Sequence, residues 1–260
     1  STTMEAYLIP TAPSSMYYIS DFITAEEEAF LIRSVGNAAA SFCISYTDHA
    51  EIPSNRWVPL SHRRLQALPS RLTANNTLLP SPLPAWLEHP VLERLKSLDG
   101  IFADAPHGIN HCLINEYLPG QGIMPHEDGG AYHPVVATVS LGGSTVLEVS
   151  QKRAADSETA EALKDSSSGA GTKTWRILQE PCSLLITCGS AYTETLHGIA
   201  EVMEDVDLSE HTVANWSLLG DRQHIVAQGG RSERETRISL TLRDVKKVSG
   251  LGAKLFGKIR

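Results

Sequence analysis

The sequence predicts an α+β fold that is mainly β: a β-sandwich, barrel or jelly roll that follows a helical front. Three observations support this fold class. From Ile109 onward, apolar residues recur with a period of two in short runs. Gly and Pro separate these runs, as expected of turns between strands. Before residue 100, apolar residues recur at helical spacing instead.

The helical front covers about residues 17–100 and begins with a short strand and a helix in YYISDFITAEEEAFLIRSV. Thr24 and Glu27 stand three positions apart before an apolar run at helical spacing, which is the pattern of a capping box. A second helical region is expected in PLPAWLEHPVLERLKSL, where prolines stand at the start and leucines fall on one side.

The jelly-roll-like core covers about residues 109–244 and contains six short strand patterns: INHCLINEYL, PVVATVSLG, STVLEV, WRILQ, CSLLITCG and RISLTLR. Two segments, 151–174 and 201–233, interrupt the strands and are rich in charge, Ser or Gly. We expect both to be mobile insertions. No linker separates the helical and β-rich parts, so we expect one domain over residues 1–260, with a basic tail at 245–260.

Composition limits the function classes. The formal net charge of −8 and the pI near 5.7 give no general attraction to nucleic acid, so any such contact must be local. The four cysteines lack zinc or disulfide-framework spacing, which favours a reducing location in the cytoplasm, the nucleus or both. No signal peptide and no run of about 18 apolar residues is found, so we expect no membrane span. We expect a monomer.

The stretch NEYLPGQGIMPHEDG, residues 115–129, contains the first candidate site. On a strand, residues i and i+2 point to the same side, so His126 and Asp128 can present two ligands to one metal ion. Ten His and thirty acidic residues produce roughly one H-x-[DE] by chance, so context decides. The other match, HAE at 49–51, lacks flanking strands and is interpreted as a loop.

A third ligand is expected from His197 in YTETLHGI, because it follows the apolar strand SLLITCG and its turn. His107, His111 and His133 are weaker candidates by position. Two His and one carboxylate leave open coordination positions, which suits non-haem Fe(II). Zinc in a hydrolase would accept the same three ligands, and the triad alone does not separate the two.

The run RISLTLR predicts an anion site. Its apolar residues alternate with Arg237, Ser239, Thr241 and Arg243, which therefore share one polar face. At about 3.3 Å per residue, the two arginine Cα atoms lie roughly 20 Å apart, and their inward arms leave a gap of about the length of a five-carbon diacid. This spacing matches 2-oxoglutarate, whose carboxylates suit arginine forks.

The strand INHCLINEYL adds two polar side chains to the same pocket. Asn115 and Tyr117 are two positions apart and share a strand face. Each residue alone has an ordinary explanation as a hydrogen-bonded group at the mouth of a barrel. Together with the metal triad and the arginines, they favour one metal and diacid site.

These motifs resemble those of the AlkB-type Fe(II)/2-oxoglutarate-dependent dioxygenases. The family pattern N-x-Y-x-x-G-x-x-[IL]-x-x-H-x-D is matched in full from Asn115 to Asp128. The family HGI is matched at 197–199 and R-x5-R at Arg237 and Arg243. Within the family, the chain is most similar to the branch numbered six, over nearly its whole length except the two insertions.

The resemblance implies a double-stranded β-helix, a jelly roll with N-terminal helices packed on it, and an oxidoreductase that uses Fe(II), 2-oxoglutarate and O2. His126, Asp128 and His197 would hold the iron. The cosubstrate residues would be Tyr117, Arg237 and Ser239 at the C5 carboxylate, with Asn115 and Arg243 at the C1 end. Oxidation of an N-methyl group would be coupled to conversion of the cosubstrate to succinate and CO2, and would release formaldehyde.

The segment RWVPLSHRRLQ resembles the family's substrate lid. The candidate substrate-contacting residues are Arg56, Trp57, Arg63 and Arg64 in this segment, and Tyr132 outside it. The arginines either touch phosphate or form a solvated charge run. Two features differ from the family: the stretch Gly129 to Ala131 stands where repair members carry acidic residues, and Ser239 replaces a common Asn. The first difference puts nucleobase substrates in question and leaves the oxidation chemistry in place.

The tail after Asp244 carries only basic charges between apolar residues and is amphipathic if helical. It either packs on the protein or, with the lid, contacts DNA or RNA. Three functions remain open: an oxidative demethylase of alkylated nucleic acid, a protein or small-molecule hydroxylase on the same scaffold, and a non-catalytic nucleic-acid or protein binder that keeps iron and 2-oxoglutarate.

Overall fold

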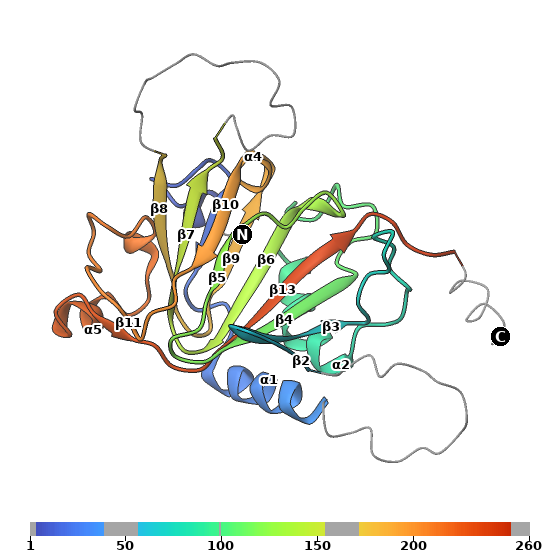
Figure 1. The fold of residues 1–260 in the computed structure, drawn as a ribbon, viewed down its shortest axis with the longest axis horizontal. Coiled ribbons are helices and arrows are strands. Elements are labelled where there is room, and N and C mark those ends of the chain that lie inside the picture. Colours follow the sequence, from blue (N-terminus) through green and yellow to red (C-terminus); the bar gives the residue numbers. More distant parts are fainter. Residues whose placement is uncertain (1–3, 39–56, 99, 154–171, 251–260) are drawn as a thin grey trace.

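The computed structural model describes residues 4–38, 57–98, 100–153 and 172–250, and Figure 1 shows their arrangement. Two antiparallel sheets dominate. The larger has the strand order β1-β9-β6-β13-β4-β3-β2. Its strands are β1 (Met16–Ile19), β2 (Val58–Leu60), β3 (Arg63–Leu68), β4 (His111–Tyr117), β6 (Tyr132–Gly142), β9 (Leu184–Cys188) and β13 (Arg237–Val245).

The smaller sheet has the order β5-β10-β7-β8, and residues from both sheets line one cavity between them. Its strands are β5 (Ile123–His126), β7 (Thr145–Gln151), β8 (Thr174–Gln179) and β10 (Thr195–Ile199). Consecutive strands alternate between the two sheets at several points, as in a jelly roll. The expected mainly β jelly-roll fold is therefore confirmed.

Strand β13 separates the apolar core from the cavity. Ile238, Leu240 and Leu242 belong to the main hydrophobic core, whereas Arg237 and Arg243 line the cavity. The strand pairs with β4 on one side and β6 on the other, so it lies inside the large sheet. The alternation that the sequence predicts for RISLTLR is thus observed residue by residue.

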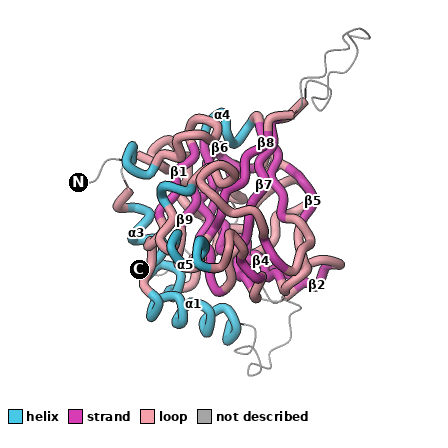
Figure 2. Tube along the Cα trace, turned by 90° about the vertical axis from the view of Figure 1, so that its left-hand side faces the viewer, coloured by secondary structure: helices cyan, strands magenta, loops and turns pink. Residues whose placement is uncertain are grey.

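Helix α1 and the helical region that contains α3 (Glu93–Lys96) pack on the core of the large sheet, and Figure 2 shows both beside it. Helix α1 (Ala25–Ala38) buries Leu31 and Val35 against the sheet core. Its capping box is present: Thr24 N–H donates to Glu27 Oε2 at 2.8 Å, and Glu27 N–H donates to Thr24 Oγ1 at 3.2 Å. The same Glu27 pairs with Arg94 at 2.7 Å.

The second helical region is present but broken. It comprises α2 (Ala85–Leu87), η2 (Glu88–Leu92) and α3 (Glu93–Lys96). His89 has the extended dihedrals φ −118° and ψ 123°, because it precedes Pro90, which disfavours the helical conformation. The remaining short elements are η1 (Met4–Tyr7), α4 (Gly189–Thr193), β11 (Glu204–Asp205), η4 (Trp216–Leu218), α5 (Arg222–Ala227) and β12 (Ser232–Glu233).

Residues 201–233 correct one expectation, because they form a folded cover on the small sheet instead of a mobile insertion. Leu208, Val213, Leu219 and Ile225 are buried in the second hydrophobic core. The buried Asn215 donates to the Leu178 carbonyl at 2.8 Å and accepts from the Leu178 N–H at 2.9 Å. These partners are 37 residues apart, so the local composition gives no sign of them.

The other expected insertion and the tail fall partly outside the described residues. In the first, residues 151–153 and 172–174 belong to or flank β7 and β8, and 154–171 are not described. In the tail, Val248 forms a parallel bridge with Leu78, whereas 251–260, with the expected amphipathic pattern, are not described. Among the described helices, none is long and apolar enough to cross a membrane.

Candidate active site

The turn between β4 and β5 delivers the first two candidate ligands. Gly120 adopts a φ of +81°, and the Gln121 side chain caps the turn by accepting from Leu118 N–H at 2.9 Å. A Cβ on Gly122 would approach the Ile199 carbonyl oxygen within 2.2 Å, so only glycine fits there. The turn thereby brings β5 against β10.

Strand β10 places His197 directly opposite His126. The two residues are antiparallel partners, and their ring centroids are 4.5 Å apart. The next residue, Gly198, faces the Pro125 backbone, where an added Cβ would come within 2.9 Å. The glycine of the HGI motif therefore permits the close strand contact that sets the distance between the two imidazoles.

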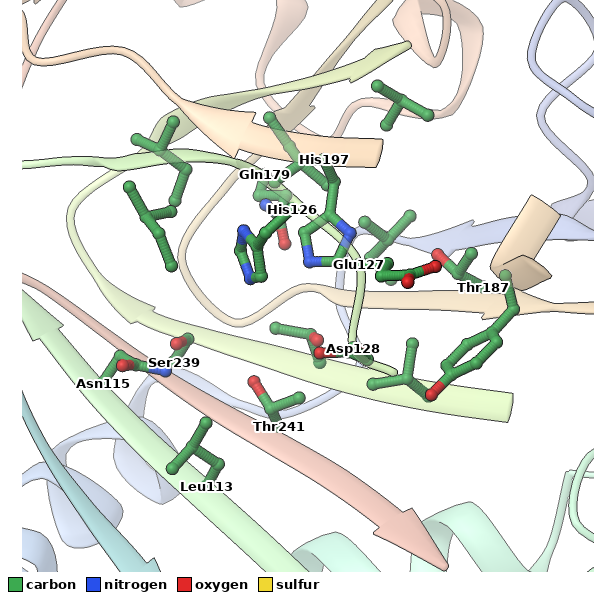
Figure 3. Close-up of a pocket in the computed structure, with 18 of the residues that line it drawn as sticks. Leu113, Asn115, His126, Glu127, Asp128, Gln179, Thr187, His197, Ser239 and Thr241 are labelled. Carbon is green, nitrogen blue, oxygen red and sulfur yellow. The ribbon is translucent and has the colours of Figure 1, made fainter. Parts of the chain in front are cut away.

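His126, Asp128 and His197 form a cluster whose ligand atoms all lie within 4.8 Å of one another. Figure 3 shows both imidazoles and the Asp128 carboxylate facing the same space. His126 Nδ1 is 2.9 Å from the Met124 carbonyl oxygen, which fixes the ring and leaves Nε2 for a metal ion. The arrangement could hold a metal and leaves coordination positions free.

Burial keeps His197 in the protonation state that a metal ligand needs. It lowers the pKa of His197 to about 4, although the Asp128 charge opposes the shift. The imidazole is therefore neutral near pH 7, with its lone pair available for coordination.

Arg237 lies on the cavity floor with an exposed fraction of 3%. Its Nη2 donates to Ser140 Oγ at 2.9 Å and to Gln179 Oε1 at 3.3 Å. Burial lowers its pKa to about 10, so the guanidinium is still charged at neutral pH. Among the described residues its Nε has no hydrogen-bond partner. A buried donor of this kind suits an anionic ligand.

Arg243 joins the anion side of the cavity to the metal side. Its Nη2 is 2.9 Å from Asp128 Oδ1, and both side chains are less than a tenth exposed. Its guanidinium also stacks on Tyr132, 4.5 Å from the ring centroid. Like that of Arg237, its Nε has no partner in the described part of the chain. The sequence predicts two arginines that are both free to bind the diacid. Arg243 is instead already paired with Asp128, a candidate metal ligand.

The remaining expected cosubstrate residues lie between the two arginines. Asn115, Tyr117 and Ser239 all line the cavity, and Asn115 pairs with Ser239 across the sheet. Tyr117 stands opposite Arg237, whose guanidinium is 5.9 Å from the ring centroid. The cavity volume is about 280 Å³. The structure thus brings together all eight residues that the sequence assigns to metal and cosubstrate.

The expected lid is only partly at the site. Arg56 lies outside the described residues. Arg64 points away from the cavity, pairs with Glu116 at 2.6 Å and stacks over Trp57 at 4.4 Å. Among the described residues 57–66, only Arg63 lines the cavity. For Arg64 the ordinary explanation as a paired surface charge therefore applies.

The weaker histidine candidates are not part of the metal cluster. His107 Nε2 is 3.3 Å from the Lys246 carbonyl, and His111 is buried opposite Arg243 with a pKa lowered to about 4 by burial and by the Arg243 charge. His133 lies on β6 and does not line the cavity. The residues 49–51 of the second H-x-[DE] match are not described.

Two cavity residues escaped the sequence interpretation. Gln179 binds Arg237 from the end of the apolar strand β8, where a polar residue on a buried face was the available signal. Tyr192 donates from its hydroxyl to the Gly129 carbonyl at 3.1 Å and closes the loop after Asp128. Burial, reinforced by Asp128, raises the pKa of Tyr192. No local pattern marks Tyr192.

Comparisons with known proteins agree with this geometry. The family model for the 2OG-Fe(II) oxygenase superfamily matches residues 15–243. The chain belongs to this superfamily. Members of this superfamily are oxidoreductases that use Fe(II), 2-oxoglutarate and O2, so this oxygenase is an enzyme of that class. Its His/Asp/His cluster could bind the metal.

The oxygenase is 38% identical to the zebrafish (Danio rerio) protein named probable RNA/DNA demethylase ALKBH6, over 94% of this chain and 92% of that protein. It is also 26% identical to uncharacterized protein L905 of Acanthamoeba polyphaga mimivirus, over 87% and 83% of the respective lengths. The solved structure of OsALKBH1 is 16% identical, with a TM-score of 0.48 and coverage of 89% and 99%. The first relative confirms the AlkB-type resemblance and its branch numbered six.

Proposed function

We propose that this oxygenase demethylates alkylated DNA or RNA by oxidising an N-methyl group. The observation that supports the chemistry is one cavity that contains the His126, Asp128 and His197 cluster beside two buried arginines with unpartnered Nε donors. The support for the substrate is the 38% identical relative, whose name describes an RNA/DNA demethylase.

In the proposed site, His126, Asp128 and His197 hold Fe(II). The donor set fits, because two imidazoles and one carboxylate are the ligands of mononuclear non-haem iron. When bound, Fe(II) with 2-oxoglutarate and O2 supplies the oxidation of a substrate C–H bond and the conversion of 2-oxoglutarate to succinate and CO2. The hydroxylated N-methyl group then leaves as formaldehyde, and the free amine remains.

The protein side chains orient the cosubstrate and exclude water. Arg237, Ser239 and Tyr117 hold its C5 carboxylate, because a buried guanidinium with a free Nε and two hydroxyl groups offers charged and neutral donors. Arg243 and Asn115 serve the C1 end. Arg243 also contacts Asp128, so it holds the cosubstrate and this metal ligand in a fixed position relative to each other.

The proposal is tested with oligonucleotides that carry N-methylated bases in DNA and in RNA. With Fe(II), 2-oxoglutarate and oxygen, we expect formaldehyde and succinate in equal amounts and the unmethylated base by mass spectrometry. The matched control is the same oligonucleotide without the methyl group. Turnover on peptides or metabolites with none on any oligonucleotide would refute the substrate assignment but not the oxidation chemistry.

A second substrate class, a protein or a small molecule, has specific support. Arg64 is paired with Glu116 and therefore offers no free charge to phosphate. Gly129 and Gly130 follow the metal aspartate and bring no side chain to a base, and the net charge is −8. Succinate release in the presence of peptides, compared with oligonucleotides, separates the two substrate classes.

A further inference from the structure

Among the described residues, three arginines line the cavity, although the proposed site uses only Arg237 and Arg243. The third, Arg63, comes from the β2–β3 hairpin at the edge of the large sheet. β3 pairs with β4 in the register Arg64 to Glu116, which places Arg63 beside Tyr117. Tyr117 faces Arg237 on its other side.

Arg63 makes one specific bond at the cavity wall. Its Nε donates to Asn115 Oδ1 at 3.1 Å. Within the described part of the chain it forms no ion pair, so its charge is not neutralised by a neighbouring carboxylate. Asn115 itself has an exposed fraction of 7% and lines the cavity.

The bond decides which end of the Asn115 amide faces the ligand. An amide has one acceptor oxygen and one NH2 with two donors. Because Arg63 occupies the oxygen, the NH2 group is left to serve the cavity, and only that end can bind a carboxylate. An amide turned the other way would present its oxygen to an anion, which is repulsive.

The adjacent Arg64 provides a natural contrast. Successive residues on a strand point to opposite faces, so Arg64 faces away from the cavity while Arg63 faces into it. Arg64 is also more exposed and paired with Glu116 at 2.6 Å. One hairpin thus carries one arginine that holds the hairpin to β4 from outside and one that reaches the site.

We propose that Arg63 is a positioning residue that sets the Asn115 amide for 2-oxoglutarate and thereby couples the β2–β3 hairpin to cosubstrate binding. This inference rests on the proposed function, in which Asn115 binds the cosubstrate. Coupling is reciprocal: if the Arg63 bond favours the cosubstrate, bound cosubstrate stabilises the docked hairpin by the same factor. The stability of the docked hairpin therefore depends on whether 2-oxoglutarate is bound.

The test measures 2-oxoglutarate binding by titration calorimetry on the full chain loaded with Fe(II) without oxygen. We expect Arg63→Ala to weaken binding about tenfold, as the loss of one charged hydrogen bond predicts, and Arg63→Lys to weaken it by about threefold. Arg64→Ala, the matched control on the other face, keeps the dissociation constant within about twofold.

A double-mutant cycle identifies the mechanism. Asn115→Ala removes the amide, so adding Arg63→Ala to it should weaken 2-oxoglutarate binding by less than about twofold. Hydrogen exchange gives a second readout: amides of the hairpin, residues 58–68, become more protected when wild-type protein binds 2-oxoglutarate, and this gain is lost in Arg63→Ala.

Several outcomes overturn the inference. Equal affinity of wild type and Arg63→Ala, or equal loss in Arg64→Ala, would show that Arg63 does not position the site. An undiminished Arg63→Ala effect in the Asn115→Ala background would assign the effect to charge alone. If wild type binds no 2-oxoglutarate, the proposed function itself fails. If wild type binds 2-oxoglutarate and Arg237→Ala does not, the proposed cosubstrate site is supported. A failed double-mutant cycle would then overturn the Arg63 inference alone.

Discussion

The metal side and the anion side of the cavity are built in opposite ways. His126 ends β5, Asp128 lies in the loop after it, and His197 is on β10; β5 is a four-residue edge strand of the small sheet with two exposed residues. The arginines stand on β13, which lies inside the large sheet and is buried along all nine residues. We therefore call the metal side the rim, because it includes the edge strand β5, and the anion side the floor, because it lies on the buried strand β13.

The difference has a physical reason. Buried arginines lose hydration, so they hold an anion firmly only in a fixed geometry that a central strand provides. The metal ion, oxygen and substrate must reach their positions from solvent, which favours ligands at an open edge. Arg243 is the connection, since it belongs to the floor and contacts Asp128 of the rim.

The largest expected effect comes from cutting this connection. Asp128→Ala should abolish metal binding and turnover, and it should also lower the free energy of unfolding of the metal-free protein by about 3–5 kcal/mol, because Arg243 is left buried without its ion pair. Metal content and urea unfolding measure the two effects. His126→Ala is the control: it should lose metal with little loss of stability, because it breaks no buried ion pair. Equal destabilisation by both variants would contradict the rim and floor distinction.

Removing the floor alone should separate cosubstrate from metal. Arg237→Ala should weaken 2-oxoglutarate binding by about 100-fold, the loss of a bidentate charged contact, while iron content stays at the wild-type level. Calorimetry and metal analysis on the same preparation test this. Loss of metal together with 2-oxoglutarate would mean that the two sides fold as one unit.

Stability should depend on pH through the buried histidines. Burial lowers the pKa of His111 to about 4, against an unfolded value near 6.5, so between these values the unfolded chain binds more protons. The contribution to stability is complete above about pH 6.5 and is lost as pH falls toward 4, by about 3 kcal/mol.

His111→Gln tests this assignment, because glutamine does not titrate. In metal-free protein, the slope of the free energy of unfolding between pH 6.5 and 4 should be smaller than in wild type, with the remainder due to His197, whose pKa is also lowered to about 4. An unchanged slope, measured by urea unfolding at several pH values, would mean that His111 is not the titrating group.

Local patterns predicted the parts of the site that follow strand geometry. The alternation in RISLTLR predicts which side chains face the cavity. His126 and Asp128 do lie close together, but Asp128 is in the loop after β5, so strand alternation does not explain its position. His197 was found from its position after a strand, although its contact with His126 depends on the antiparallel pairing of β5 and β10. The alternation in RISLTLR and the position of His197 need only a period of two and the order of the strands.

The rest depends on contacts between distant residues. Gln179 reaches Arg237 over 58 positions, and Asn215 holds residues 201–233 to β8 over 37. Polar and Gly-rich composition alone predicted mobility for that segment, because the few buried leucines and the Asn215 bonds have no periodic pattern. Similarly, the pairing of Arg64 with Glu116 follows from the register of β3 and β4, which composition does not reveal.

The smallest expected effect lies on the rim. Lys152 forms an ion pair with Glu127 and donates to the Thr193 carbonyl at 2.7 Å, which ties the metal loop to the end of β7. Lys152→Ala should cost less than about 1 kcal/mol of stability, because Glu127 is half exposed and exposed pairs contribute little. Iron affinity should fall only a few-fold, while 2-oxoglutarate affinity of the iron-loaded protein should not change. A large loss of 2-oxoglutarate binding in this variant would show that contacts on the rim position the arginines of the floor. That result would contradict the separation of the two sides.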